Sequence, residues 1–134
     1  MIYPKSGIIK QGENMNKIIE YKLNSLSKSK FRSSFKLKPK DIDYINDKGL
    51  KTIENHTREF IINRLAPKSP KNDGKQTPFK GHPCFIAQHA CACCCRSCLE
   101  KWHHIPKGKN LTQSEINYIV NILIEWIKKE YKNT

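Results

Sequence analysis

The residues best suited to chemistry in this 134-residue chain gather in one stretch, HACACCCRSCLEKWHHIPKG, at residues 89–108. It holds five of the six cysteines and three of the five histidines. Zinc prefers about four thiolate or imidazole ligands in a tetrahedron. Cys95 and Cys98 form a C-x-x-C step whose sulfurs can reach one ion, and Cys94 can replace Cys95 because it lies one helical turn before Cys98. With His89 and His103 on either side, the stretch predicts a mixed Cys/His zinc site.

Other interpretations of the same cysteines stay open. Cys91 and Cys94 form a second, overlapping C-x-x-C step, so that four thiolates from Cys91, Cys94, Cys95 and Cys98 would suit an iron–sulfur cluster, which we favour less. A soft ion such as Cu(I) is another alternative. The cysteines also suit simple packing as small apolar side chains. A disulfide framework fits poorly, because the Cβ atoms of adjacent cysteines diverge.

Basic side chains surround this segment, and we expect them to contact phosphate. Arg96 and Lys101 lie within it, Lys107 and Lys109 follow, and Lys75 precedes it. Phosphate contacts by Arg and Lys position a protein on nucleic acid.

A long connection, PKSPKNDGKQTPFKGHP, precedes the cysteines at residues 67–83 and contains four Pro and two Gly. A connection of this length in a small domain often serves binding or catalysis. Asp73, Lys75 and His82 are its candidate catalytic residues, with Gly74 allowing backbone N–H groups to approach an anion. The plainer interpretation is that Asp-Gly simply makes a turn.

The charge is strongly basic, with 25 Lys and Arg against 12 Asp and Glu, a formal net charge of +13. The excess is concentrated in two segments. Residues 1–40 hold ten basic and two acidic side chains, and residues 71–110 hold seven basic and two acidic side chains. Such a balance favours nucleic acid or another polyanion as partner. No run of about 18 apolar residues predicts a membrane span, and no signal-peptide core is apparent. We therefore expect a cytoplasmic protein with reduced thiols.

Apolar residues at helical spacing predict a small all-α domain of about four to five helices, with a long Pro/Gly-containing loop and a Cys/His-rich helical segment. Residues 1–30 are expected to form a mobile basic arm, with one possible helix over 15–27, and residues 31–134 a single domain. Thr112 and Glu115 form a capping box that opens the last helix. Met15 is expected to be the natural start, because QGEN before it can be encoded by a ribosome-binding sequence.

The run from Asn72 to Gly108 resembles the signature of a small bacterial family catalogued as domain of unknown function 4186, and the likeness extends from about Phe31 to Trp126. That family usually has Thr at the positions of Cys91 and Cys93 and Val at that of Cys84. The resemblance therefore implies that these three thiols are additions to a common site. The positions that match the motif are His82, His89, Cys94, Cys95, Arg96, Cys98, Trp102 and His103.

Three functions follow as hypotheses. The first is a small basic zinc-binding protein, a nucleic-acid-associated module whose metal site stabilises a modest core. The second is a metal- or thiol-dependent enzyme of hydrolytic or phosphoryl chemistry that uses residues 72–89. The third is a thiol redox or metal sensor.

Overall fold

The computed structural model describes residues 13–133, and these residues fold into seven helices without a strand. The helices are α1 (Glu13–Ser27), α2 (Lys30–Ser33), α3 (Pro39–Lys48), α4 (Leu50–Arg64), α5 (Pro83–Ala90), α6 (Arg96–His103) and α7 (Gln113–Lys132). The predicted all-α class is confirmed. The expected count of four to five helices was too low, because α1 lies in the segment expected to be a mobile arm and α2 has only four residues, too few for a clear period.

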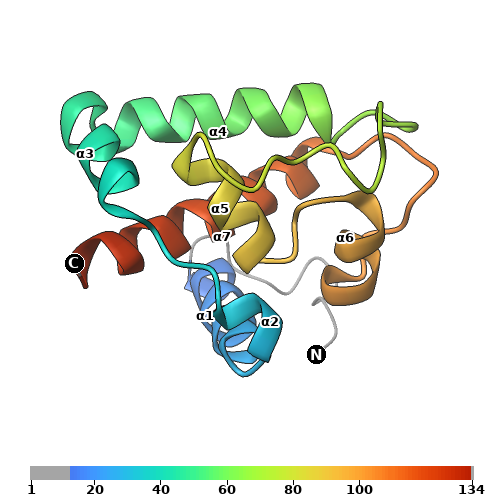
Figure 1. Ribbon diagram of the computed structural model, residues 1–134. Coiled ribbons are helices and arrows are strands. Elements are labelled where there is room, and N and C mark those ends of the chain that lie inside the picture. The colour runs from blue at the N-terminus through green and yellow to red at the C-terminus, as the bar shows by residue number, and fades with distance from the viewer. Residues whose placement is uncertain (1–12, 134) are drawn as a thin grey trace.

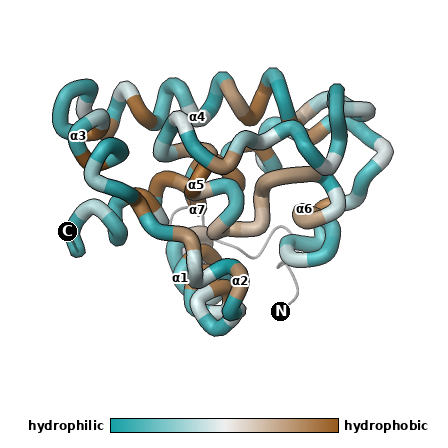
Figure 2. Tube along the Cα trace, in the orientation of Figure 1, coloured by the Kyte–Doolittle hydropathy of each residue, from teal (hydrophilic) through white to brown (hydrophobic). Residues whose placement is uncertain are grey.

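The last helix, α7, is the centre of the packing and contacts α1, α4 and α5. In Figure 1, α4 runs along one side of the molecule and α1 and α2 lie on the other, with α5 and α7 between them. Figure 2 shows hydrophobic residues concentrated on these two central helices. The predicted capping box is present, since Thr112 Oγ1 accepts from the Glu115 N–H at 3.1 Å and Glu115 accepts from the Thr112 N–H at 2.8 Å. The apolar face predicted for this helix is buried: Ile116, Ile119, Val120, Leu123 and Ile127.

The first described helix packs on the core through the apolar face that its sequence predicts, formed by Ile18, Ile19, Leu23 and Leu26. Residues 13–27, within the segment expected to be a mobile arm, thus form a packed helix. The expectation that Met15 is the natural start concerns residues 1–14, of which 1–12 lie outside the described residues. Along residues 13–133, no helix combines the length and apolar character needed to cross a membrane.

The segment between α4 and α5, residues 65–82, contains turns and bends only. The Lys68 N–H donates to the Asn110 side chain at 2.7 Å, the Leu111 N–H donates to the Ala66 carbonyl at 2.9 Å, and a buried arginine also joins this segment to the connection that follows α6. The guanidinium of Arg96 donates to the carbonyls of Leu65 and Pro67 on one side and of Pro106 and Lys109 on the other, at 2.8 to 3.2 Å. Arg96 is 1% exposed. Two irregular connections are thereby fixed around one buried cation.

Candidate metal centre

A tight turn at residues 91–95, the thiol turn, connects α5 to α6 and carries most of the cysteines. Pro83 opens α5, and His82 caps it by accepting from the Cys84 N–H at 2.9 Å. Ala92 adopts a left-handed conformation with φ of 58°, which lets the chain reverse after α5. The N–H of Cys93 then donates to the carbonyl of Gln88 at 2.8 Å, closing the turn.

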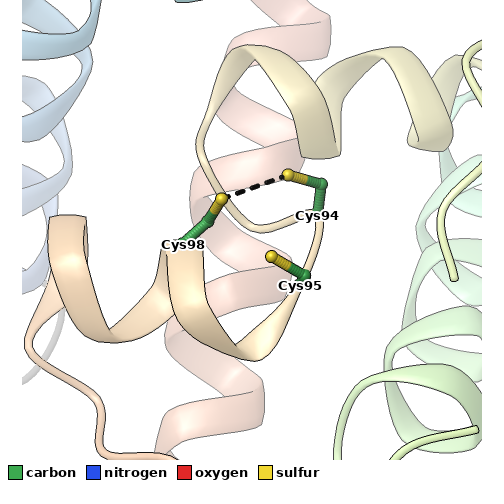
Figure 3. Close-up of side chains that lie close together, drawn as sticks. All are labelled: Cys94, Cys95 and Cys98. Carbon is green, nitrogen blue, oxygen red and sulfur yellow. Dashed lines mark hydrogen bonds between the residues drawn. The ribbon is translucent and has the colours of Figure 1, made fainter. Parts of the chain in front are cut away.

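Side chains from neighbouring segments fix the position of the thiol turn. The Gln88 amide donates to the Cys93 carbonyl at 3.0 Å, and the Thr77 hydroxyl donates to the Cys94 carbonyl at 2.8 Å. Cys95 is the N-cap of α6, and Cys98 follows in its first turn. Figure 3 shows Cys94 and Cys95 on the turn, with all three side chains converging on one space.

The three sulfur atoms of Cys94, Cys95 and Cys98 lie within 4.8 Å of one another, a spacing at which they could hold one metal ion. Cys94 donates a hydrogen bond to Cys98 across 3.6 Å, marked by the dashed line in Figure 3. Cys95 is buried, whereas Cys94 and Cys98 are partly exposed. The site is therefore preformed at the edge of the core, where an ion could enter from solvent.

Arg32 of α2 is the cation of the site. Its Nη2 donates to the Cys98 sulfur at 3.2 Å, and its Nη1 to the Cys94 sulfur at 3.7 Å. The same Nη1 donates to the carbonyl of His89 at the end of α5, at 2.7 Å. Ser29 caps α2 by accepting from the Arg32 backbone N–H at 3.1 Å, which fixes the helix that carries this side chain. Arg32 therefore joins α2, α5 and the thiols.

These contacts separate the acidities of the three thiols. The hydrogen bond from Cys94 lowers the pKa of Cys98 to about 5 against the effect of burial, and Cys95 and Arg32 lower it further. The pKa of Cys94 is raised, because it donates this bond to Cys98 and is largely buried. Burial raises the pKa of Cys95. At neutral pH the cluster thus holds one thiolate, on Cys98, beside two thiols.

The two histidines expected to complete the metal site do not join these sulfurs. His103 is buried, with Nδ1 against the Tyr118 hydroxyl at 2.7 Å and Nε2 against the Cys91 carbonyl at 2.8 Å. His89 Nε2 faces the carbonyls of Thr77 and Pro78 at 3.2 and 3.1 Å. His103 has no free ring nitrogen, and sequence spacing alone could not reveal these acceptors from other segments.

The remaining cysteines, Cys84, Cys91 and Cys93, are fully buried. Burial raises the pKa of each of them, to about 12 for Cys84. They are protonated thiols that pack as small apolar side chains. Because Cys91 lies apart from the three clustered sulfurs, the described residues do not assemble the four-thiolate alternative.

The basic residues expected to contact phosphate are scattered. Arg96 is buried among carbonyls and is not placed at the surface. Lys109 pairs with Glu115 at 2.9 Å, and Lys107 reaches the Ser97 hydroxyl at 3.3 Å. Lys75 and Lys101 are exposed.

The candidate catalytic residues Asp73, Lys75 and His82 do not form a common site. Asp73 accepts from the Arg96 N–H at 3.4 Å, at the start of α6, where a carboxylate stabilises the helix. Lys75 points to solvent. His82 caps α5 and lies 3.1 Å from His56, and burial followed by the neighbouring imidazole lowers its pKa to about 4. Asp73 and His82 thus both cap helices.

Sequence reasoning missed Arg32, the one cation that donates to the Cys94 and Cys98 sulfurs among the described residues. It lies about sixty residues before the cysteines, in a stretch of Lys and Ser with no chemical motif. The Ser29 cap and the apolar face of the preceding helix were local signals of order, but neither identifies a partner in α6.

The fold and the site define a small, basic, all-α protein with a preformed cluster of three thiols at the edge of its core. The chain belongs to the family described as Domain of unknown function (DUF4186), whose model matches residues 20–128. The family resemblance of the sequence is confirmed and covers somewhat more of the chain than expected. No solved structure matches this protein.

Proposed function

We propose that the protein binds one metal ion, zinc, through the thiolates of Cys94, Cys95 and Cys98. The observation that carries the proposal is the convergence of three sulfurs within 4.8 Å in a turn whose backbone is fixed from two sides. Preorganised ligands lose little freedom on binding, which favours affinity.

The charge of the site suits a divalent ion. Three thiolates with Zn²⁺ carry a net charge of −1, and the guanidinium of Arg32 beside Cys94 and Cys98 balances it. Thiolates are ligands that zinc shares with Cu(I), whereas an iron–sulfur cluster commonly requires four. Because Cys94 and Cys95 are protonated before binding, zinc is expected to displace two protons near neutral pH.

Three protein ligands leave a fourth zinc position for an exchangeable molecule, in contrast to a closed structural site. Such a position suits a catalytic or sensing role better than the purely structural role expected from the sequence. The buried packing of α1, α4, α5 and α7 also supports a fold that does not depend on the ion.

A titration with Co²⁺, a spectroscopic substitute for zinc, tests the proposal. The expected result is one ion per chain with a strong sulfur-to-metal charge-transfer band, competed by Zn²⁺. Cys94→Ser and Cys98→Ser should each weaken binding strongly. Cys84→Ala removes a buried thiol outside the cluster and should leave binding unchanged. Equal binding by all variants, or none by the native chain, contradicts the proposal.

Thiol redox chemistry is a second candidate, favoured by the 3.6 Å contact between Cys94 and Cys98. The Cys98 thiolate would attack hydrogen peroxide, break the O–O bond and become a sulfenic acid, while the departing hydroxide takes a proton to form water. The Cys94 sulfur would then attack Cys98, forming a disulfide as a second water leaves with the Cys94 proton. Two electrons pass from the two thiols to one peroxide.

Mass spectrometry of the metal-free protein after one equivalent of peroxide tests the redox candidate, because it identifies which cysteines have been oxidised. A Cys94–Cys98 disulfide, reversed by a dithiol and prevented by prior zinc loading, supports it. Persistent free thiols, or oxidation spread evenly over all cysteines, count against it.

A further inference from the structure

Two exposed phenylalanines belong to one aromatic cluster beside the thiols. Phe31 is 57% exposed and Phe79 is 66% exposed. Phe31 packs edge-on against Phe35 with ring centroids 5.2 Å apart, and the Phe35 and Phe79 rings lie 14° from parallel at 6.3 Å. We call Phe31, Phe35 and Phe79 the aromatic platform.

One ring of the platform offers a flat face to solvent. Phe79 lies on the imidazole of His89, with centroids 4.1 Å apart and planes 7° from parallel. His89 is buried, so it covers one face of the Phe79 ring and leaves the outer face open. A fixed ring with an open face is the arrangement on which an unpaired base can stack.

The segments that carry the platform contain no acidic residue. Residues 21–40 hold seven Lys and Arg, and residues 74–99 hold three, without Asp or Glu in either segment. Lys30, Lys36 and Lys80 are exposed and adjoin the platform phenylalanines in the chain. The guanidinium of Arg32 lies 5.0 Å from the centre of the Phe31 ring. The charge of this surface therefore complements phosphate.

A groove between α1, α2 and α7 lies next to the platform and shares Phe35 with it. It has a volume of about 220 Å³, and its walls include Phe35, Lys36, Trp126 and Lys129. Each of its two lysines is paired with a carboxylate, Lys36 with Glu130 at 3.8 Å and Lys129 with Glu20 at 3.0 Å. The groove thus carries aromatic and basic side chains and includes Phe35 of the platform.

We infer that the aromatic platform and its neighbouring lysines bind single-stranded nucleic acid, with bases stacked on Phe79 and Phe31 and phosphates beside the lysines. Sequence-tolerant binding of single strands combines these two features. A lipid surface fits less well, because membrane-surface binding typically uses a long amphipathic helix. Here Phe31 lies on a four-residue helix and Phe79 lies in an irregular connection. The inference is independent of metal binding.

Fluorescence anisotropy with a labelled thymidine oligonucleotide of about 15 nucleotides tests the inference, since single-strand sites span about 4–16 nucleotides. The expected result is binding at low salt that weakens steeply as salt rises. Phe79→Leu and Phe31→Leu keep an apolar side chain but remove the ring, and each should weaken binding about fivefold or more.

Matched variants separate stacking from general charge and from misfolding. Ile62→Ala alters a 43% exposed apolar residue of α4 outside the platform and should leave affinity unchanged. Lys80→Ala should reduce the salt dependence more than Lys51→Ala on α4. Circular dichroism should show unchanged helix content in every variant.

Three results would overturn the inference. They are no binding at low salt, binding that the two leucine variants do not weaken, and tighter binding to duplex of equal length. Platform-dependent binding to vesicles of phosphatidylserine and phosphatidylcholine, without binding to the oligonucleotide, would assign the surface to lipid instead.

Discussion

Removing the guanidinium beside the thiols should change the reactivity of Cys98. Arg32→Gln eliminates a positive charge 3.2 Å from the Cys98 sulfur and 3.7 Å from the Cys94 sulfur. A nearby opposite charge commonly lowers a pKa by about one to three pH units. The pKa of Cys98, lowered to about 5 mainly by Cys94, should therefore rise to between about 6 and 8 in the variant.

The consequence is measurable at neutral pH. With a pKa of about 5, Cys98 is almost entirely thiolate at pH 7, whereas a pKa near 8 leaves about one tenth. Because the thiolate is the nucleophile, alkylation of metal-free Cys98 by iodoacetamide at pH 7 should slow by up to about tenfold. Peptide mass spectrometry measures the rate at Cys98 itself, and a series of pH values gives the midpoint.

The control is Arg58→Gln, because Arg58 of α4 donates to the Asn117 side chain of α7 at 2.9 Å. It should leave both the rate and the midpoint unchanged. If the midpoint for Cys98 in Arg32→Gln equals that of the native chain, Arg32 does not stabilise the thiolate and the electrostatic account of the site is wrong.

Three further predictions concern the scaffold. Arg96→Met should lower the free energy of unfolding in urea by at least about 3 kcal/mol, because it leaves several buried carbonyls without their hydrogen-bond donor; unchanged stability would refute this role. His103 has its pKa lowered to about 4 by burial, so the unfolded chain binds its proton first as pH falls from about 6.5 to 4. His103 should therefore contribute a loss of about 2 kcal/mol in the free energy of unfolding from pH 7.5 to 5, in addition to the loss from His82, whose pKa is also lowered to about 4. His103→Gln should remove the part due to His103, and a pH profile identical to that of the native chain would contradict this role. Thr112→Ala should cost about 1 kcal/mol in thermal or urea unfolding by removing the cap of α7, and no loss would show that the cap is unimportant.

The sequence predicted the long helices well, because each depends on local patterns. The apolar spacing from Ile116 to Ile127 and the Thr112–Glu115 box define α7 without tertiary information. The face from Ile18 to Leu26 likewise identified the helix that packs on it. The four-residue helix α2 was not predicted, because a single turn is too short to show a helical period in the sequence.

The site was predictable in part. The structure places the sulfurs of Cys94, Cys95 and Cys98 close together, as their spacing suggests, because all three lie within one turn of the chain. The same spacing suggested His103 as a further ligand, but its ring nitrogens face the Tyr118 hydroxyl and a backbone carbonyl. Such long-range partners depend on how helices pack, which no local pattern encodes.

Arg32 and Phe79 are residues of the opposite kind, which the sequence did not identify as part of a site. Neither was among the candidate site residues, yet packing of α2 on α5 brings Arg32 to the thiols, and the folding of residues 65–82 places Phe79 on His89 of α5. The basic excess of the chain indicated a polyanion partner but did not identify a surface. The aromatic platform becomes visible only when exposure and ring geometry are considered together.

X-ray absorption at the zinc edge of the zinc-loaded protein tests the central claim most directly. The account predicts one zinc per chain with a shell of three sulfur atoms at about 2.3 Å and one lighter atom. Cys98→Ser should lose a sulfur from that shell or lose the zinc. A shell of nitrogen and oxygen alone, four sulfur atoms, or a protein that retains no zinc would contradict a metal centre of Cys94, Cys95 and Cys98.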